Sequence, residues 1–398
     1  MPSKDELKIL QALPLDLKIS KTKLRIKEWV NHYGTNGVYV SFSGGKDSTV
    51  LLHIVRQMYP DIEAVFVNTG LEYPEIQSFV KSFENVTILR PKMRFDEVIR
   101  KYGYPFIGKK QADTISGARN SLCKGVYSLR LRECGVSIEE AKQMGLNIPS
   151  QEMLNRYLAA CENSKFVMAK YKPLLFVDFN ISHYCCNVIK KAPMYDYQKL
   201  TGKVPITAQM AEESMLREAV WLKNGCNAFE AKHKISNPMS FWTEQDILQY
   251  INIYQVEFDD TLKRANNLRD KKTRKEARKW LKKCNYKRFE IVPVYGEVLY
   301  RVNNGILYEN ILCDCGVKLC TTGCDRTGCI FCGFGAHLEK GESRFQRLKR
   351  THPRQYEYCM GGGAYDSDGL WKPTKEGLGM AHCIDELNKI YGKDFIKY

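Results

Sequence analysis

The sequence has 398 residues, 44% of them hydrophobic, and a mean hydropathy of −0.40, which suits a globular chain long enough for one large domain or two. It has no run of 18 apolar residues and begins with the charged stretch MPSKDELKIL, so we expect a cytoplasmic protein without membrane span or signal peptide. The net charge of +16 and the fifteen cysteines are unusual, and clustered cysteines in a reducing compartment favour metal or redox chemistry over disulfide bonds.

Up to residue 90 the chain alternates between helical and strand patterns. Residues 3–33 carry apolar side chains at helical spacing and predict an N-terminal helix. Three short apolar runs then predict strands, with helices between them. Buried strands are expected at 38–42 and 63–68 and a third strand at 86–90, and the helices are expected at 48–59 and 76–83. This alternation predicts an α/β fold with a doubly wound, mostly parallel, Rossmann-like sheet.

Beyond residue 90 the pattern is sparser, and residues 100–180 predict no definite element. A strand is expected at 204–208, helices are expected at 212–222, 243–254 and 379–391, and the Gly-rich residues 361–376 are expected to be loose. The sequence predicts five consecutive parts: an N-terminal helical segment (1–35), an α/β domain (36–260), a basic helical insertion (261–310), a Cys-rich segment (311–360) and a C-terminal tail with a helix (361–398).

A polar, glycine-containing loop, SGGKDS at 43–48, joins the first predicted strand to the helix after it. Its two glycines allow a tight turn that brings backbone N–H groups close to an anion, and the helix N-terminus adds partial positive charge. Lys46 supplies a full positive charge, and the hydroxyls of Ser43, Ser48 and Thr49 supply further donors. The alternative is a plain strand–helix turn without a ligand, but the loop favours a phosphate site.

The loop does not match a Walker A motif, which needs Gly at position 40 and Ser or Thr at position 47, where this chain has Val40 and Asp47. It resembles the PP-loop of the ATP pyrophosphatase superfamily (adenine nucleotide alpha hydrolase-like), whose members hold the pyrophosphate of ATP and cleave beside the α-phosphate. The resemblance implies ATP or a related adenylyl nucleotide as ligand and Lys46, Asp47 and Ser48 as catalytic residues, with Asp47 a candidate Mg²⁺ ligand. The nucleotide-binding residues that it implies are Ser41, Ser43, Gly44, Gly45, Lys46, Asp47, Ser48, Thr49, Asn68, Thr69, Gly70, Glu72 and Arg217.

Three further segments resemble motifs of the phosphoadenylyl-sulfate (PAPS) reductase family within that superfamily. VFVNTGLEYPE (65–75) resembles its Asp/Asn-Thr-Gly motif, and SNPMSFWTEQDILQYI (236–251) resembles its Pro-x-x-x-Trp-Thr helix. ITAQMAEES (206–214), with Arg217 after it, resembles Thr-Gly-x-Arg-x-x-x-Ser, although Ala208 replaces the Gly and Met210 or Gln209 replaces the Arg, which leaves one phosphate or sulfate contact open. A basic stretch at 342–359 resembles segments of phage-type and prophage-type members.

Two cysteine pairs stand far apart in the sequence, Cys185-Cys186 and Cys329-x-x-Cys332. Four thiolates can hold zinc or a [4Fe–4S] cluster. The pattern Cys-Cys-x-x-x-Lys-x-x-Pro followed by a distant Cys-x-x-Cys resembles the cluster site of adenylyl-sulfate reductases. That resemblance implies these four cysteines as ligands of one [4Fe–4S] cluster, with Lys190 as an electrostatic partner. A rival set uses Cys320 and Cys324 with the second pair, and a separate zinc site is the other alternative.

The chain departs from the sulfonucleotide reductases of this family in two ways. Those reductases carry a nucleophilic cysteine in Glu-Cys-Gly-(Leu or Ile)-His near the C-terminus, whereas this chain has AHCID at 381–385 and ECGV internally at 133–136. They also usually lack a Lys in the phosphate loop, where this chain has Lys46. Both departures favour ATP over a ready-made sulfonucleotide as the ligand.

Residues 263–288 carry 13 Lys or Arg and predict one or two basic helices. They form either a solvated face or a surface for a nucleic acid or another polyanion. Three functions remain open. The first is an enzyme that cleaves ATP at the α-phosphate and couples this to sulfur transfer, with a sulfur donor protein as a candidate partner. The second is a sulfonucleotide reductase that releases sulfite, and the third is a non-catalytic regulator that binds a nucleotide or nucleic acid.

Overall fold

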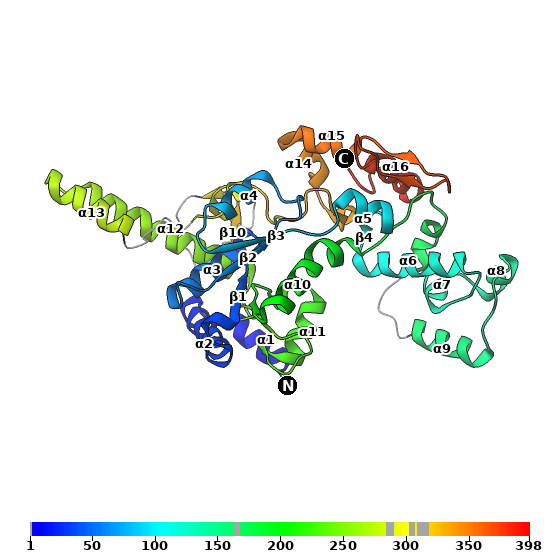
Figure 1. Cartoon of the computed structure of the whole chain (residues 1–398), viewed down its shortest axis with the longest axis horizontal. Coiled ribbons are helices and arrows are strands. Elements are labelled where there is room, and N and C mark those ends of the chain that lie inside the picture. The colour runs from blue at the N-terminus through cyan, green and yellow to red at the C-terminus, as the bar shows by residue number, and fades with distance from the viewer. Residues whose placement is uncertain (1, 163–167, 284–289, 302–306, 309–317) are drawn as a thin grey trace. The chain divides into compact units, whose positions relative to one another are not determined.

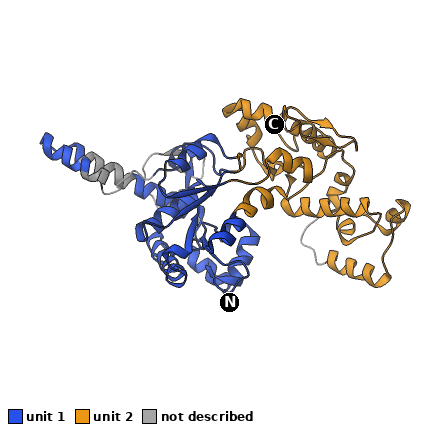
Figure 2. Ribbon diagram, in the orientation of Figure 1, with its two compact units in different colours: residues 1–68, 72–89, 194–327 blue, residues 69–71, 90–193, 328–398 orange. Residues whose placement is uncertain are grey.

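We describe a computed structural model of the chain (Figure 1), which covers residues 2–162, 168–283, 290–301, 307–308 and 318–398. The chain forms two compact units (Figure 2), each assembled from segments that are distant in the sequence. Unit 1 contains residues 1–68, 72–89 and 194–327, and unit 2 contains residues 69–71, 90–193 and 328–398. The division into five consecutive parts stays a prediction. No helix among the described residues is long and apolar enough to cross a membrane.

A six-stranded sheet with the order β3-β2-β1-β5-β7-β6 forms the centre of unit 1. Its strands are β1 (Val38–Ser41), β2 (Ala64–Val67), β3 (Val86–Leu89), β5 (Val204–Ile206), β6 (Asn227–Ala228) and β7 (Ile235–Ser236). All neighbours are parallel except β6, which is antiparallel to β7. The mostly parallel α/β sheet expected from the sequence is confirmed. Since β1 pairs with β2 on one side and with β5 on the other, the strand order reverses at β1.

The helices of unit 1 follow the expected pattern with one difference. The N-terminal region forms two helices, because Pro14 lacks the backbone N–H that a continuous helix needs. The helices are α1 (Lys4–Gln11), α2 (Leu15–Tyr33), α3 (Lys46–Met58), α4 (Pro74–Lys81), α11 (Met215–Asn224), α12 (Glu244–Asn266) and α13 (Lys271–Lys283). Helix α10 (Ala192–Thr201) begins in unit 2 and continues in unit 1. Short 3₁₀ turns are η1 (Thr35–Gly37), η4 (Ala211–Glu213) and η5 (Pro293–Tyr295), and a small sheet has the order β10 (Lys318–Thr321), β8 (Val298–Arg301), β9 (Leu307–Tyr308).

Both faces of the six-stranded sheet are covered, as a doubly wound fold requires. Val38 and Val40 of β1 point into the larger core, which also holds Trp29 of α2. Tyr39, between them, points to the other face and packs edge-on against Tyr197 of α10, with ring centroids 5.3 Å apart. This alternation is the side-chain geometry of a strand that is buried on both faces.

A buried ion pair ties α2 to the start of α12 within unit 1. The Lys18 ammonium donates to Asp246 Oδ2 at 2.6 Å, and the two side chains are only 2% and 9% exposed. The same carboxylate oxygen accepts from the backbone N–H of Thr243 at 2.6 Å, which caps α12. Nearby, the Trp242 indole N–H donates to the Thr22 hydroxyl at 2.8 Å. These contacts fix the segment that leads into α12.

Unit 2 is mostly helical. Its elements are α5 (Phe95–Tyr102), β4 (Phe106–Ile107), α6 (Lys109–Cys123), α7 (Leu129–Glu133), α8 (Ile138–Gln143), α9 (Gln151–Glu162), the 3₁₀ turn η2 (Ala169–Leu175), the π-helical turn η3 (Asn187–Lys191), β11 (Gly333–Phe334), η6 (Ala336–Leu338), α14 (Arg344–Thr351), α15 (Pro353–Met360), β12 (Ala364–Tyr365), β13 (Trp371–Lys372) and α16 (Met380–Tyr391). The expectation that 361–376 is loose was wrong, because β12 and β13 form a hairpin and the Tyr365 hydroxyl donates to Asp178 at 2.7 Å.

We predict that Lys18→Met lowers the free energy of unfolding by about 3–5 kcal/mol, because it leaves the Asp246 carboxylate buried without its counter-ion. Denaturant titration of the full chain measures this loss. Lys8→Met removes a lysine whose pair with Asp5 is exposed, and should change stability by less than about 1 kcal/mol. Equal effects of the two substitutions would contradict the assigned role of Lys18.

His53 of α3 makes unfolding pH-dependent, because burial, with Lys23 as a second cause, lowers its pKa from 6.5 to about 4. Its Nδ1 lies 2.7 Å from the Tyr250 hydroxyl. The unfolded state therefore binds more protons than the folded state between pH 6.5 and 4. Stability should fall across this window as the pH is lowered, by about 3 kcal/mol from this residue. The difference between wild type and His53→Gln in denaturant titrations isolates the contribution, and parallel pH profiles would contradict it.

Candidate nucleotide loop and thiol cluster

The loop between β1 and α3 lies at the carboxyl end of β1, where the strand order of the sheet reverses. Ligands of open α/β sheets bind at such positions. Gly44 has φ +72°, and a Cβ there would lie 2.8 Å from Ile76 and 2.9 Å from Val80 of α4, so both conformation and space require glycine. The Ser43 and Ser48 hydroxyls lie 2.9 Å apart and close the loop.

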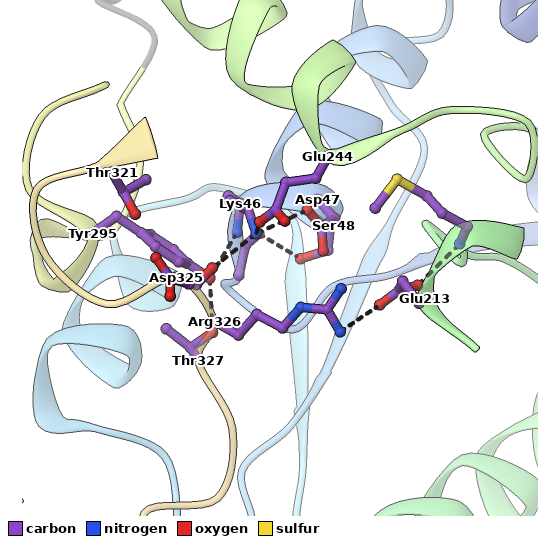
Figure 3. A network of polar contacts seen from close by, with 12 residues as sticks. Lys46, Asp47, Ser48, Glu213, Glu244, Tyr295, Thr321, Asp325, Arg326 and Thr327 are labelled. Atoms are coloured by element: carbon purple, nitrogen blue, oxygen red, sulfur yellow. Dashed lines mark hydrogen bonds and ion pairs between the residues drawn. The ribbon is translucent and has the colours of Figure 1, made fainter. Parts of the chain in front are cut away.

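Lys46 is the first residue of α3 and is only 2% exposed. Its ammonium lies 3.1 Å from Glu244 Oε1 and 3.6 Å from Asp47 Oδ1, and it donates to the Asp325 carbonyl at 3.0 Å (Figure 3). Burial lowers the pKa of Lys46, but the attraction of Asp47 and Glu244 outweighs burial and the pKa is raised. Lys46 is therefore a permanent cation at the base of the loop.

The pKa of Asp47 is also raised, which for a carboxyl group disfavours the charged form. Burial raises its pKa, and the nearby cations Lys46 and Arg326 offset only part of this effect. Its Oδ1 atom is buried and accepts no hydrogen bond from any described residue. A buried carboxylate oxygen without a donor is a suitable ligand for a hard cation such as Mg²⁺. Asp47, the Mg²⁺ candidate from the sequence, therefore has a buried oxygen that lies 3.6 Å from the Lys46 ammonium and has no hydrogen-bond partner among the described residues.

Two chain segments far from the loop in the sequence complete its surroundings. Tyr295, at the end of η5, is 2% exposed, and its hydroxyl accepts from the Lys46 backbone N–H at 3.2 Å. The Thr327 hydroxyl lies 2.9 Å from the Tyr295 hydroxyl, and a Cβ on Gly45 would be 3.2 Å from the Thr327 hydroxyl. Residues 325–327 thus lie against the first turn of α3.

Glu213 brings two arginines to the same network. It pairs with Arg217 of α11, and its Oε1 lies 3.7 Å from Nη1 of Arg326. Its Oε2 also accepts from the Met210 backbone N–H at 3.0 Å. The pKa of Arg217 is lowered first by burial and then by the nearby charge of Arg326.

The remaining predicted nucleotide residues follow β1 and β2. Ser41 ends β1 and is half-buried, and Asn68 follows β2, where its side chain donates to Gln77 at 3.3 Å. Glu72 is 7% exposed and belongs to unit 1 like the loop, whereas Thr69 and Gly70 belong to unit 2.

Both cysteine pairs lie in unit 2. Cys185 and Cys186 are helical and precede the π-helical turn η3, an irregularity that is frequent at functional sites. A hydrogen bond to Cys186 is the largest cause that raises the pKa of Cys185, with burial next and then the charges of Cys186, Cys332 and Cys329. The same hydrogen bond, with Lys109 and Lys190, lowers the pKa of Cys186 although burial opposes it. The four thiols are thus within electrostatic reach of one another.

Local contacts hold the second pair in place. The Ile330 N–H donates to the Leu71 carbonyl at 2.8 Å, and β11, directly after Cys332, pairs with β4. The Arg344 guanidinium donates to the Cys332 carbonyl at 2.9 Å. Burial raises the pKa of the Cys332 thiol, while Arg344 acts in the opposite direction.

The donor set suits a cluster with four thiolate ligands, and the cations near it would offset the negative charge of the thiolates. Among the described residues, no group of three or more Cys, His, Asp or Glu side chains is already arranged around a common metal position. The rival cysteines belong to unit 1, where Cys324 is buried in the core and Cys320 lies in β10.

Sequence reasoning missed several members of the loop network. Glu244 directly follows the Trp-Thr motif, so the motif itself was a signal for it. Tyr295 and residues 325–327 lie in segments without a recognisable pattern, and only the folded chain brings them to Lys46. Lys109 opens α6 and reaches Cys186, also without a local signal.

The fold and the loop define an α/β protein of the doubly wound class with a strand–turn–helix phosphate loop. Residues 37–119 match the phosphoadenosine phosphosulfate reductase domain family, a stretch that includes β1, the loop and β2. Over this stretch the chain is therefore similar to the phosphoadenosine phosphosulfate reductase domain family.

Individual relatives agree with this assignment over limited lengths. An uncharacterised protein of Methanocaldococcus jannaschii is 38% identical over 73 residues, which is 17% of this chain and 18% of that protein. The adenosine 5'-phosphosulfate reductase of Bacillus mycoides is 23% identical over 163 residues, covering 39% of this chain and 65% of the reductase. The Bacillus cereus reductase is 23% identical over 162 residues, with the same coverage. The chain thus spans less than two thirds of the length of these relatives.

Proposed function

We propose that the protein binds ATP, or a related adenylyl nucleotide, at the loop between β1 and α3 and cleaves it beside the α-phosphate. The observation that carries this proposal is the buried Lys46 cation at the first turn of α3, within ion-pair distance of two acidic side chains, Asp47 and Glu244, that a phosphate chain can replace. The loop N–H groups and the α3 N-terminus favour the same anion. Mg²⁺ is assigned to Asp47, whose Oδ1 lacks a donor among the described residues.

We link this cleavage to sulfur transfer through the cysteines of unit 2. Cys185, Cys186, Cys329 and Cys332 would hold a [4Fe–4S] cluster, with zinc as the alternative metal. Such a cluster supplies a redox centre whose potential depends on the charges and hydrogen bonds around its sulfur atoms. Lys109, Lys190 and Arg344 supply positive charge near these thiols.

A sulfonucleotide reductase is the second candidate function, favoured by the adenosine 5'-phosphosulfate reductases among the relatives. That reaction needs a reactive cysteine nucleophile. Cys383 in the AHCID segment is fully buried within α16, and burial raises its pKa well above the ordinary value. A buried neutral thiol is a poor nucleophile, so this cysteine supports the ATP reaction over the reductase.

A nucleic acid is the acceptor that suits the charge of the chain. Helix α13 presents Lys271, Lys272, Lys275 and Lys279 to solvent, and its described side chains include one acid, Glu276. Such a helix attracts polyanions without reading a base sequence.

We predict that Lys46→Met reduces pyrophosphate release from ATP roughly 10- to 100-fold, because one charge-assisted contact to the phosphates is lost. The assay uses anaerobically purified full-length protein with Mg²⁺ and a sulfide source, and offers transfer RNA or DNA as acceptor. Lys203→Met is the control, since Lys203 pairs with Glu63 in the same unit but outside the loop network.

The same preparations are incubated with adenosine 5'-phosphosulfate, or its 3'-phosphorylated form, and a thiol reductant. Sulfite release from either without pyrophosphate release from ATP would replace the first proposal by the reductase. Tight nucleotide binding without turnover of any of the three compounds would favour the third function, a non-catalytic regulator.

We predict that anaerobically purified protein contains about four iron and four sulfide per chain, as one [4Fe–4S] cluster requires. Cys186→Ser and Cys329→Ser should each lose most of the iron, and Cys226→Ser, in unit 1, should keep it. Loss of iron in Cys320→Ser or Cys324→Ser would favour the rival ligand set. Iron-free protein with one equivalent of zinc would identify the site as a zinc site, and metal-free protein would refute both.

A further inference from the structure

Arg326 lies in a segment whose neighbouring residues on both sides contact the phosphate-loop network. The Asp325 carbonyl accepts from the Lys46 ammonium at 3.0 Å, and the Thr327 hydroxyl lies 2.9 Å from the Tyr295 hydroxyl. These contacts fix the backbone beside the loop. Residue 326 lies outside the stretch that matches the reductase domain family, which ends at residue 119, so the family match assigns it no role.

The Arg326 side chain extends from this segment past Lys46, Asp47 and Ser48 toward Glu213 (Figure 3). Its Nη1 is 3.7 Å from Glu213 Oε1, which is longer than the roughly 2.7–2.9 Å of a charge-assisted hydrogen bond. The side chain remains 56% exposed, whereas the Glu213 side chain is 11% exposed. Arg326 therefore makes a loose ion pair and keeps most of its donors available to solvent or a ligand.

Two guanidinium groups share this one carboxylate. Arg217 pairs with Glu213 from α11, and its charge and that of Arg326 repel each other. Both arginines also act on Asp47 at the loop, which places their charges within electrostatic reach of the phosphate site. An anion with several oxygens could satisfy both guanidinium groups better than one carboxylate does.

We propose that Arg326 and Arg217 form a clamp for the part of the nucleotide chain beyond the α-phosphate, with Glu213 holding both arginines until the ligand replaces it. The inference rests on the proposed function, because it takes the loop as the site of the pyrophosphate group. Planar guanidinium groups bind phosphate oxygens in a bidentate manner. Arg326 then determines specificity, since a triphosphate carries the phosphates that the clamp holds and a monophosphate lacks them.

The test is isothermal titration of the full-length protein with Mg²⁺-ATP and with AMP. Arg326→Gln should weaken ATP binding about tenfold, the effect of one charge-assisted hydrogen bond, and change AMP binding less than about twofold. Arg326→Lys keeps the positive charge but lacks the planar guanidinium group for bidentate binding, and should show an intermediate loss of ATP affinity. Arg350→Gln removes an exposed arginine that pairs with Glu342 in unit 2, and should match wild type for both ligands.

Glu213→Gln tests whether the ligand replaces Glu213 as the partner of the two arginines, and here the expected change is a gain in ATP affinity. The amide oxygen can still accept from the Met210 N–H, but the negative charge that competes with the ligand is gone. ATP should bind several-fold more tightly, with AMP unchanged. Weaker ATP binding by this variant would contradict the role of Glu213.

The outcomes distinguish the proposed arginine clamp from the proposed binding of ATP at the loop. Wild-type protein that binds neither ATP nor AMP refutes both proposals. Wild-type protein that binds ATP, with Arg326→Gln binding it equally well, refutes the clamp alone. Equal weakening of ATP and AMP also refutes the clamp, because Arg326 would then act on the whole nucleotide site and not on the phosphates beyond the α-phosphate. AMP binding by each variant also shows that the rest of its nucleotide site is folded.

Discussion

The buried cation of Lys46 is the constraint on which the candidate site depends. An ammonium that is 2% exposed is stable only with charge or hydrogen-bond partners at close range. Asp47 comes from the same helix, but Glu244 and the Asp325 carbonyl come from segments about 200 and 280 positions further along the chain. The need to satisfy this one charge explains why the start of α12 and residues 325–327 converge on the loop.

The same requirement links the stability of unit 1 to its chemistry. Glu244 is positioned by the start of α12, which Thr243 and Asp246 cap and which the buried Lys18 anchors to α2. Helix α2 therefore supports the site, although none of its residues contacts the loop network directly in the described contacts. A substitution at Lys18 should consequently affect the position of Glu244 as well as the stability of the fold.

Local patterns were sufficient to predict the sheet and the loop, and insufficient for the contacts that complete them. Strand and helix periodicity located β1, β2, β3 and α3 within two residues, because a run of apolar residues in the sequence is enough to mark each of them. The same reasoning extended one helix across Pro14 and described 361–376 as loose, since a hairpin held by Asp178 depends on a residue almost 190 positions away. Tyr295 and Arg326 escaped detection for the same reason: their role follows from folding and not from a local motif.

The charges of the loop network suggest why a divalent cation should accompany the nucleotide. Lys46, Arg217 and Arg326 already face the carboxylates of Asp47, Glu213 and Glu244. A bare phosphate chain that took these cations would leave the carboxylates without partners in a partly buried site, which is costly. A nucleotide that binds together with Mg²⁺ brings a positively charged partner for the Asp47 carboxylate at the same time. Under the proposed function, nucleotide affinity should therefore depend on Mg²⁺ more strongly in wild type than in Asp47→Asn, where that carboxylate has been removed.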